Sequence, residues 1–143
     1  MILETAAIAI GSVIATKALE KTTEKVTETL LDKTSKFLVT LKKQSPHTVV
    51  AIEKAPEQPL DYGKALLEVE SAAKANPEVA QAAQELVQAA KAEKNINFIQ
   101  SLQQQADFLK SQQSSSVINY QKLADEIKNV FQGNTFNAPV TFN

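Results

Sequence analysis

Hydrophobic side chains are most concentrated in the first sixteen residues, MILETAAIAIGSVIAT, where Glu4 carries the only charge. The large apolar side chains of this stretch are Ile2, Leu3, Ile8, Ile10, Val13 and Ile14. We expect such a stretch to be buried in a core or used against another apolar phase. It lacks the positive charges that open a secretory signal peptide, and it is shorter than the roughly 20 apolar residues that cross a bilayer. We therefore expect neither a signal peptide nor a ready transmembrane helix here.

Further along, the apolar positions follow the period of an α-helix. Five of them, spaced by seven, four, seven and four residues, share one helical face: Leu19, Val26, Leu30, Phe37 and Leu41. No proline interrupts residues 2–43, so the pattern predicts one long helix over this range. Gly11 and the pair Thr22–Thr23 are its weak points.

The rest of the chain divides into shorter helices at prolines and capping residues. Ser45-Pro46 and Asn76-Pro77 each combine an N-cap residue with a proline suited to the first turn, and Asn95 opens a further segment. The predicted helices cover residues 46–54, 61–75, 77–93, 95–109 and 118–132, with a loop at 55–59 and a polar connector at 111–116. The pattern predicts an all-α fold, a helical bundle with a long N-terminal helix, as one domain over residues 1–131.

The last twelve residues depart from the helical pattern. Gly133 is predicted to end the final helix, and beyond it four apolar residues alternate with polar ones: Phe136, Ala138, Val140 and Phe142. Alternation, β-propensity, asparagines and the absence of charge are typical of segments that stack into steric zippers. No other stretch reads as a strand, so a partner strand would come from another molecule. The alternative is a disordered C-terminal tail, which Pro139 favours, and the sequence leaves both open.

Charge is unevenly distributed, although the net charge is only −1. Residues 17–43 carry seven lysines against four acidic residues, whereas residues 44–143 carry eight lysines against eleven. Lys17, Lys21 and Lys25 each precede an acidic residue by three positions, a spacing that pairs charges on a helix. A basic segment after an apolar one suits an anionic membrane surface, and pairing with the acidic remainder of the chain is the alternative. The absence of arginine argues against nucleic-acid binding.

The side chains offer little for catalysis. The chain has no cysteine and one histidine, His47, which we expect to be exposed at the start of a helix. The sequence holds no Ser-His-Asp set, no cluster of metal-ligating residues and no glycine-rich phosphate loop. We therefore expect no enzymatic activity, no metal and no cofactor. For Glu4, a satisfied, partly buried carboxylate is favoured over a group that acts in a pore or a switch.

Two features together resemble a known family. The sequence MILETAAIAIGSVIATKALEK runs directly into a helical bundle, and a G-N-x-F-x-x-x-V-x-F-N segment follows it. In these features the chain resembles the Bell domains of multicellular bacteria, relatives of the fungal HeLo and HeLo-like domains. Those domains are distantly similar to the four-helix bundle of the mixed-lineage-kinase-like pseudokinase and act as membrane-targeting cell-death effectors. The resemblance divides the chain into a bundle and a motif at residues 132–143.

The resemblance implies a mechanism in bacterial immunity. An amyloid signalling motif is templated by a matching motif on a NOD-like receptor, and self-assembly then sends the cytoplasmic protein to the lipids of the inner face of the plasma membrane. The implied membrane-inserting residues are Ile2, Leu3, Glu4, Ile8, Ile10, Val13 and Ile14, with Lys17, Lys21 and Lys25 at the membrane surface. The implied motif residues are Gly133, Asn134, Phe136, Asn137, Val140, Phe142 and Asn143. At rest, helices 64–75 and 77–92 would shield the apolar N-terminal segment.

Two other functions fit the same sequence. The protein could be a helical signalling adaptor, recruited through its C-terminal motif, in which residues 1–16 are ordinary core. It could also be a structural helical protein with an inert tail. Membrane activity separates the first function from both alternatives.

Overall fold

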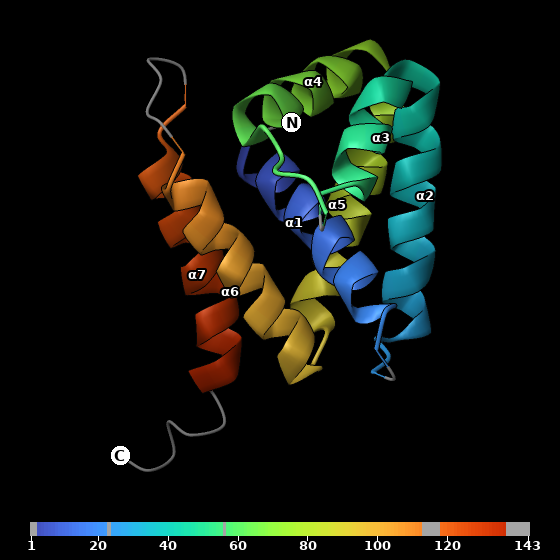
Figure 1. The fold of residues 1–143 in the computed structure, drawn as a ribbon. Coiled ribbons are helices and arrows are strands. Elements are labelled where there is room, and N and C mark those ends of the chain that lie inside the picture. The colour runs from blue at the N-terminus through green and yellow to red at the C-terminus, as the bar shows by residue number, and fades with distance from the viewer. Residues whose placement is uncertain (1–2, 23, 56, 113–117, 137–143) are drawn as a thin grey trace.

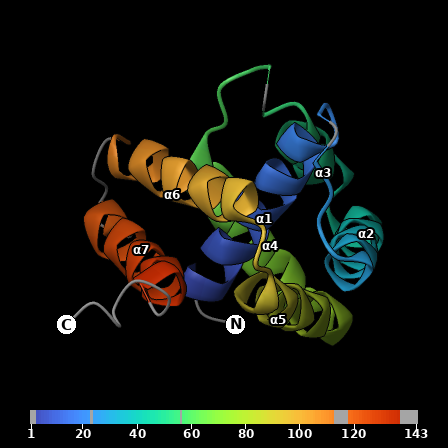
Figure 2. The same cartoon turned by 90° about the horizontal axis from the view of Figure 1, so that it is seen from below.

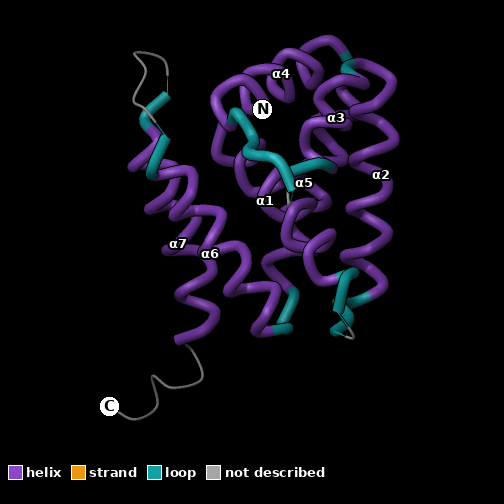
Figure 3. Tube along the Cα trace, in the orientation of Figure 1, coloured by secondary structure: helices purple, strands orange, loops and turns teal. Residues whose placement is uncertain are grey.

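The computed structural model describes residues 3–22, 24–55, 57–112 and 118–136, with side chains described up to residue 131. Over these residues the chain forms seven α-helices and no strand, as Figures 1 and 3 show. The helices are α1 (Leu3–Leu19), α2 (Glu28–Gln44), α3 (Pro46–Glu53), α4 (Tyr62–Ala75), α5 (Pro77–Ala92), α6 (Ile96–Lys110) and α7 (Tyr120–Phe136). The predicted all-α bundle is confirmed.

Helix α1 runs through the middle of the bundle. Figure 2 shows it between α6 and α7 on one side and α2 and α3 on the other, with α4 and α5 along a third side. It contacts all six other helices, and most extensively α5 and α6. Every residue from Ala6 to Thr16 is buried. Because consecutive residues of an α-helix point to all sides, α1 is enclosed around its whole circumference.

The other helices pair with one another around α1. Helix α2 packs along α5 and against α3, whereas α6 and α7 form a closely packed antiparallel hairpin (Figure 1). These outer helices are amphipathic, so each turns one apolar stripe inward. On α2 the buried stripe includes Leu30, Phe37 and Leu41, as its sequence spacing predicts.

Local capping residues set several helix boundaries. Ser45-Pro46 separates α2 from α3, and Asn76-Pro77 separates α4 from α5, as predicted, but the Ser45 side chain makes no capping hydrogen bond to α3. The Asn76 side chain accepts a hydrogen bond from the Glu78 amide at 3.0 Å. The Asn95 side chain likewise accepts from the Asn97 amide at 2.8 Å at the start of α6. Each bond satisfies an amide that has no partner within its helix.

The prediction of one helix over residues 2–43 is wrong. Helix α1 ends at Leu19, α2 begins at Glu28, and residues 24–27 between them are not helical. The chain reverses here, so that α1 and α2 run antiparallel (Figure 1). The Thr27 amide donates to Glu93 Oε1 at 2.9 Å, in the connection between α5 and α6. Tertiary hydrogen bonds therefore hold a break that local sequence marks only weakly.

Helix α7 continues to Phe136, so the prediction that Gly133 ends this helix is also wrong. Residues 137–143 hold the rest of the predicted extended segment and lie outside the described residues.

We predict that Gly11 is required for the close approach of α1 and α6. A Cβ atom at Gly11 would lie 3.3 Å from Leu102 Cδ2 and 3.7 Å from Gln105 Cβ. The substitution Gly11→Leu should therefore lower the free energy of unfolding by about 1–3 kcal/mol, as overpacking does in other cores. Urea denaturation followed by circular dichroism measures this. Ala51→Leu, on an exposed position of α3, is the control and should stay within about 0.5 kcal/mol. An unchanged midpoint for Gly11→Leu would contradict the prediction.

Candidate functional site

The side chains expected to enter a membrane lie at the centre of the bundle. Ile8 and Ile14 are 2% and 3% exposed, and Ile10 and Val13 are fully buried. Leu3 is half-buried at the start of α1, whereas Ile2 lies outside the described residues. The sequence signal for this burial is that α1 has no polar face, which is typical of a helix with no solvent-exposed side.

Small residues are buried on the two helices that contact α1 most extensively. Ala83 and Ala90 of α5 and Ala106 of α6 are fully buried. The predicted shield of residues 64–75 and 77–92 is present as α4 and α5, which both contact α1. The sequence missed α6, which contacts α1 as extensively as α5 does. Small side chains let the helices approach closely, and large buried side chains such as Leu102, beside Gly11, fill the remaining space.

Two hydroxyl groups on α1 have no hydrogen-bond partner in this enclosure. Ser12 Oγ and Thr16 Oγ1 are both buried and unpaired. A buried polar group without a partner costs about 1–3 kcal/mol. The central helix therefore carries polar atoms that its apolar surroundings do not satisfy.

At the start of α1, Glu4 faces another acid. Its side chain is half-buried and hydrogen-bonds the carboxyl group of Glu126 on α7. Burial, followed by the hydrogen bond and the charge of Glu126, raises the pKa of Glu4, and the charge of Lys91 on α5 opposes this rise. Glu4 is thus partly buried, as expected. The partner is itself acidic, so the pair is most stable when it shares a proton.

At the other end of α1, two of the lysines expected at a membrane surface are paired with acids. Lys17 Nζ lies 3.8 Å from Glu20 and 3.9 Å from Glu53, and Lys21 Nζ lies 3.5 Å from Glu57. Pairing of Lys17 with Glu20 is confirmed. Pairing of Lys21 with Glu24 does not occur, because the helix has already ended. These ion pairs are largely exposed and therefore weak.

Lys25, the third of these lysines, is exposed, and its carbonyl group accepts a hydrogen bond from Asn95 Nδ2 at 3.0 Å. It lies in the non-helical stretch before α2, so it does not continue a helical row with Lys17 and Lys21. The predicted continuous helix over residues 2–43, which would carry all three lysines, is broken by the same chain reversal.

The basic helix α2 is matched by an acid on α5. Glu85 Oε1 accepts hydrogen bonds from Lys33 Nζ at 2.9 Å and from Lys36 Nζ at 3.3 Å. The hydrogen bond from Lys33 is the largest of several effects that lower the pKa of Glu85 to about 2. Part of the basic segment thus pairs within the molecule, which was the alternative to a membrane role for its charges.

Ser45, His47 and Glu68 come together between α3 and α4, which the sequence did not predict. His47 Nε2 lies 2.8 Å from Glu68 Oε2 and 3.4 Å from Ser45 Oγ. A catalytic triad needs the serine and the acid on opposite nitrogens of the imidazole ring. Here both face the same nitrogen, so this arrangement does not activate the serine. His47 is exposed, as predicted.

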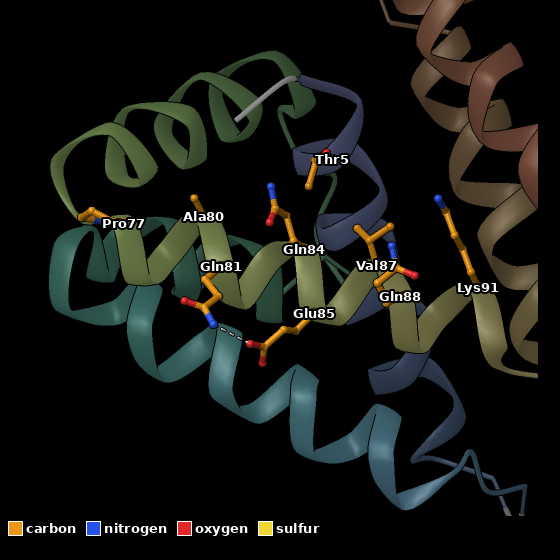
Figure 4. Close-up of a pocket in the computed structure, with 9 residues that line it drawn as sticks. All are labelled: Thr5, Pro77, Ala80, Gln81, Gln84, Glu85, Val87, Gln88 and Lys91. Atoms are coloured by element: carbon orange, nitrogen blue, oxygen red, sulfur yellow. Dashed lines mark hydrogen bonds between the residues drawn. The ribbon is translucent and has the colours of Figure 1, made fainter.

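Among the hollows that reach α1 from outside, one lies along α5 and another lies beside α6. A groove of about 720 Å³ runs along the outer side of α5, and Thr5 of α1 contributes to its edge (Figure 4). Within this groove, Gln81 Nε2 donates a hydrogen bond to Glu85 Oε2 at 3.0 Å. The other, of about 510 Å³, is lined by Ile14 and Ala18 of α1 together with Tyr62 and Phe108, among others. The aromatic rings of Tyr62 and Phe108 are 5.6 Å apart. Both hollows touch α1 away from the middle of its apolar stretch.

The predicted motif residues fall into two groups. Gly133, Asn134 and Phe136 lie in the last turns of α7, and their side chains are not described. Asn137, Val140, Phe142 and Asn143 lie outside the described residues. The predicted amyloid motif therefore stays a prediction.

Within the part of the chain that the structure describes, no helix is long and apolar enough to cross a membrane. The same residues contain no group of three or more histidine or acidic side chains arranged to hold a metal ion.

We predict that Glu4→Gln stabilises the bundle at neutral pH. Because the pKa of Glu4 is raised in the folded state, the folded protein binds this proton more readily than the unfolded chain, and stability falls as the pH rises through the folded pKa. Glutamine keeps a neutral hydrogen-bonding group at every pH. The melting temperature of Glu4→Gln should therefore exceed that of the wild type at pH 7 and approach it at pH 4 to 4.5.

Glu126→Gln is the matched control, since it removes the other member of the pair. The double variant should gain little over either single one, because both remove the same repulsion. Equal melting temperatures of Glu4→Gln and the wild type across this range would contradict the assignment.

Comparisons with family models, with curated proteins and with solved structures return no match to this chain. The resemblance to Bell domains therefore rests on the sequence features quoted for it.

Proposed function

We propose that the protein is a membrane-targeting, membrane-disrupting cell-death effector whose active element is α1. The observation that carries the proposal is that α1 is apolar on every side and enclosed by six other helices. A helix without a polar face has two stable surroundings, the interior of a protein and the interior of a bilayer. The closed bundle supplies the first, and an opened bundle at a membrane supplies the second.

The energies of the two surroundings are comparable. Fully burying one large aliphatic side chain contributes about 1.5–3 kcal/mol, so Ile8, Ile10, Val13 and Ile14 contribute roughly 6–12 kcal/mol together. That is similar to the whole stability of a domain, about 5–15 kcal/mol. Release of α1 into water would therefore open the bundle, whereas lipid hydrocarbon returns most of this free energy. The membrane is thus the acceptor that makes release possible.

The length and flanking charges of α1 suit a membrane with local adjustment. A helix of 17 residues is about 25 Å long, slightly less than the roughly 30 Å of bilayer hydrocarbon. Lys17 and Lys21 at its C-terminal end are held only by exposed ion pairs, which anionic headgroups can replace. Their long side chains reach headgroups while the helix lies deeper.

The trigger in this proposal is templated assembly of the C-terminal motif by a NOD-like receptor, as in the family that the sequence resembles. Helix α7 leads directly into the motif, and Glu126 on α7 contacts Glu4 on α1. A displacement of α7 during assembly would therefore directly disturb the contact between Glu126 and Glu4 at the start of α1. Repulsion within the Glu4–Glu126 pair makes this contact easier to open above the raised pKa of Glu4.

The second candidate is a helical signalling adaptor without membrane activity. Its support is also the enclosure of α1, which is what an ordinary core helix would have. The two functions differ in whether α1 must leave the bundle, and an experiment on this movement separates them.

A disulfide between α1 and α6 is predicted to block leakage of anionic liposomes. A Cβ atom at Gly11 would lie 3.7 Å from Gln105 Cβ, within the range of disulfides, and the chain contains no other cysteine. In the variant Gly11→Cys, Gln105→Cys, the oxidised protein should retain α1 and release no dye. Addition of a reductant should restore release.

The reduced double variant and each single cysteine variant are the matched controls. Leakage by the oxidised and reduced forms to the same extent would exclude release of α1. No leakage by the wild type, even after assembly through its C-terminal segment, would favour the adaptor.

Assembly through residues 132–143 is predicted to need the apolar positions of the alternating segment. Phe136→Asp with Val140→Asp puts charges inside the interface of a steric zipper, where they are buried without partners. This double variant should form no fibres by thioflavin T fluorescence and sedimentation. Gln121→Asp, exposed on α7, adds a charge outside the segment and should leave assembly intact. Fibres from the double variant would exclude the zipper.

A further inference from the structure

The residues between α1 and α2 keep a helical sequence pattern that the fold does not use. Leu19, Val26 and Leu30 lie at positions that share one face of a continuous helix with Phe37 and Leu41. In the structure all five are buried, yet Val26 lies in the non-helical stretch of residues 24–27. A loop does not require apolar residues at helical spacing. The closed fold therefore does not explain why this spacing continues across the break.

Polar groups from the connection between α5 and α6 hold this stretch extended. Glu93, only 5% exposed, accepts from the Thr27 amide at 2.9 Å and from the Thr27 hydroxyl at 3.0 Å. Asn95 Nδ2 donates to the Lys25 carbonyl at 3.0 Å, and Asn97 Nδ2 donates to Glu24 Oε1 at 2.9 Å. We call Glu93, Asn95 and Asn97 the clamp. Because the clamp occupies backbone groups of residues 25 and 27, it competes with helical hydrogen bonding there.

The extended linker and a continuous helix would be stabilised by similar ion pairs and hydrogen bonds. In the closed fold Lys21 pairs with Glu57, and Glu24 accepts from the clamp. In a continuous helix Lys21 would face Glu24, and Lys25 would face Glu28, at the spacing that stabilises helices. The β-branched residues of the linker favour the extended form modestly. Neither form has a large advantage from local interactions.

Packing beneath the linker is incomplete. A hollow of about 330 Å³ lies there, lined by Leu19, Val26 and Leu31, among others. The linker is therefore held by the clamp and by the burial of Val26, with solvent beside it in this hollow.

We propose that the linker between α1 and α2 refolds into helix when the clamp opens, joining α1 and α2 into one continuous helix over residues 3–44. This helix would be about 63 Å long and would carry apolar α1 away from the bundle as a stiff extension of α2. The inference rests on the proposed function, because lipid hydrocarbon is what receives α1. It adds the movement by which α1 arrives there.

The test compares two substitutions at Lys25, an exposed residue of the non-helical stretch. Proline suits an extended chain but breaks a helix interior, whereas alanine removes the same charge and favours helix. In Lys25→Pro the closed bundle should form with nearly wild-type far-UV circular dichroism. The fraction of Lys25→Pro molecules that form the continuous helix should be at least about tenfold lower than the fraction of Lys25→Ala molecules that do so.

Spin labels at Thr5→Cys and Val39→Cys report the movement, since the chain has no native cysteine. Thr5 lies near the start of α1 and Val39 near the end of α2, and these helices run antiparallel (Figure 1), so the two positions are closer together in the closed state than in a continuous helix. In a continuous helix they would be about 51 Å apart. Double electron–electron resonance is measured on the full-length protein after assembly through its C-terminal segment, with and without anionic phosphatidylserine–phosphatidylcholine vesicles. Glu93→Ala, which removes the buried acceptor of the clamp, should increase the population of the long distance.

The outcomes separate this inference from the proposed function. A long distance in Lys25→Ala that Lys25→Pro lacks supports the joined helix. Dye leakage without the long distance, or the long distance at equal population in both variants, overturns it while the membrane function stands. The long distance without leakage supports the joined helix and counts against membrane disruption. Absence of the long distance from the wild type and from Glu93→Ala with vesicles also overturns the inference.

Discussion

The structure depends on one constraint, which is that α1 has no side suitable for water. A helix with a polar face needs neighbours on one side only, but α1 needs them all around. The six other helices satisfy this requirement, each contributing one apolar stripe. Alanines on α5 and α6 and Gly11 on α1 bring the backbones close enough to close the wall.

The enclosure is complete for apolar groups and incomplete for polar ones. Ser12 and Thr16 have buried hydroxyls without partners, and Glu4 meets another acid. A core under selection for stability alone would be expected to replace such groups with apolar side chains. Their presence lowers the stability of the closed bundle at its central helix, which would favour the release of α1 in the proposed function.

The polar contacts of α1 lie at its two ends, and its apolar middle is held by packing. At the start, the acid pair connects α1 to α7, which leads toward the C-terminal segment. At the end, Lys17 and the clamp connect α1 and its linker to α3 and to the connection between α5 and α6. In the proposed mechanism, charge and hydrogen bonding control whether α1 remains in the bundle. Hydrophobic burial makes the bilayer the favoured environment once α1 is released.

Much of the local structure could be read from the sequence because its causes are local. The proline and asparagine signals at Ser45-Pro46, Asn76-Pro77 and Asn95 act within one helical turn, and the helices begin there. For α1 the sequence indicated that an apolar segment is either buried in a core or used against another apolar phase, and it left the choice open. What the sequence did not reveal depends on partners distant along the chain. The break before α2 needs Glu93 and Asn95, and the acid pair needs Glu126 beside Glu4. The sequence thus determined where most of the helices lie and that the N-terminal segment needs an apolar environment. Only the tertiary structure decided that α1 is enclosed, where the chain reverses and which charges meet, because packing of distant segments fixes all three.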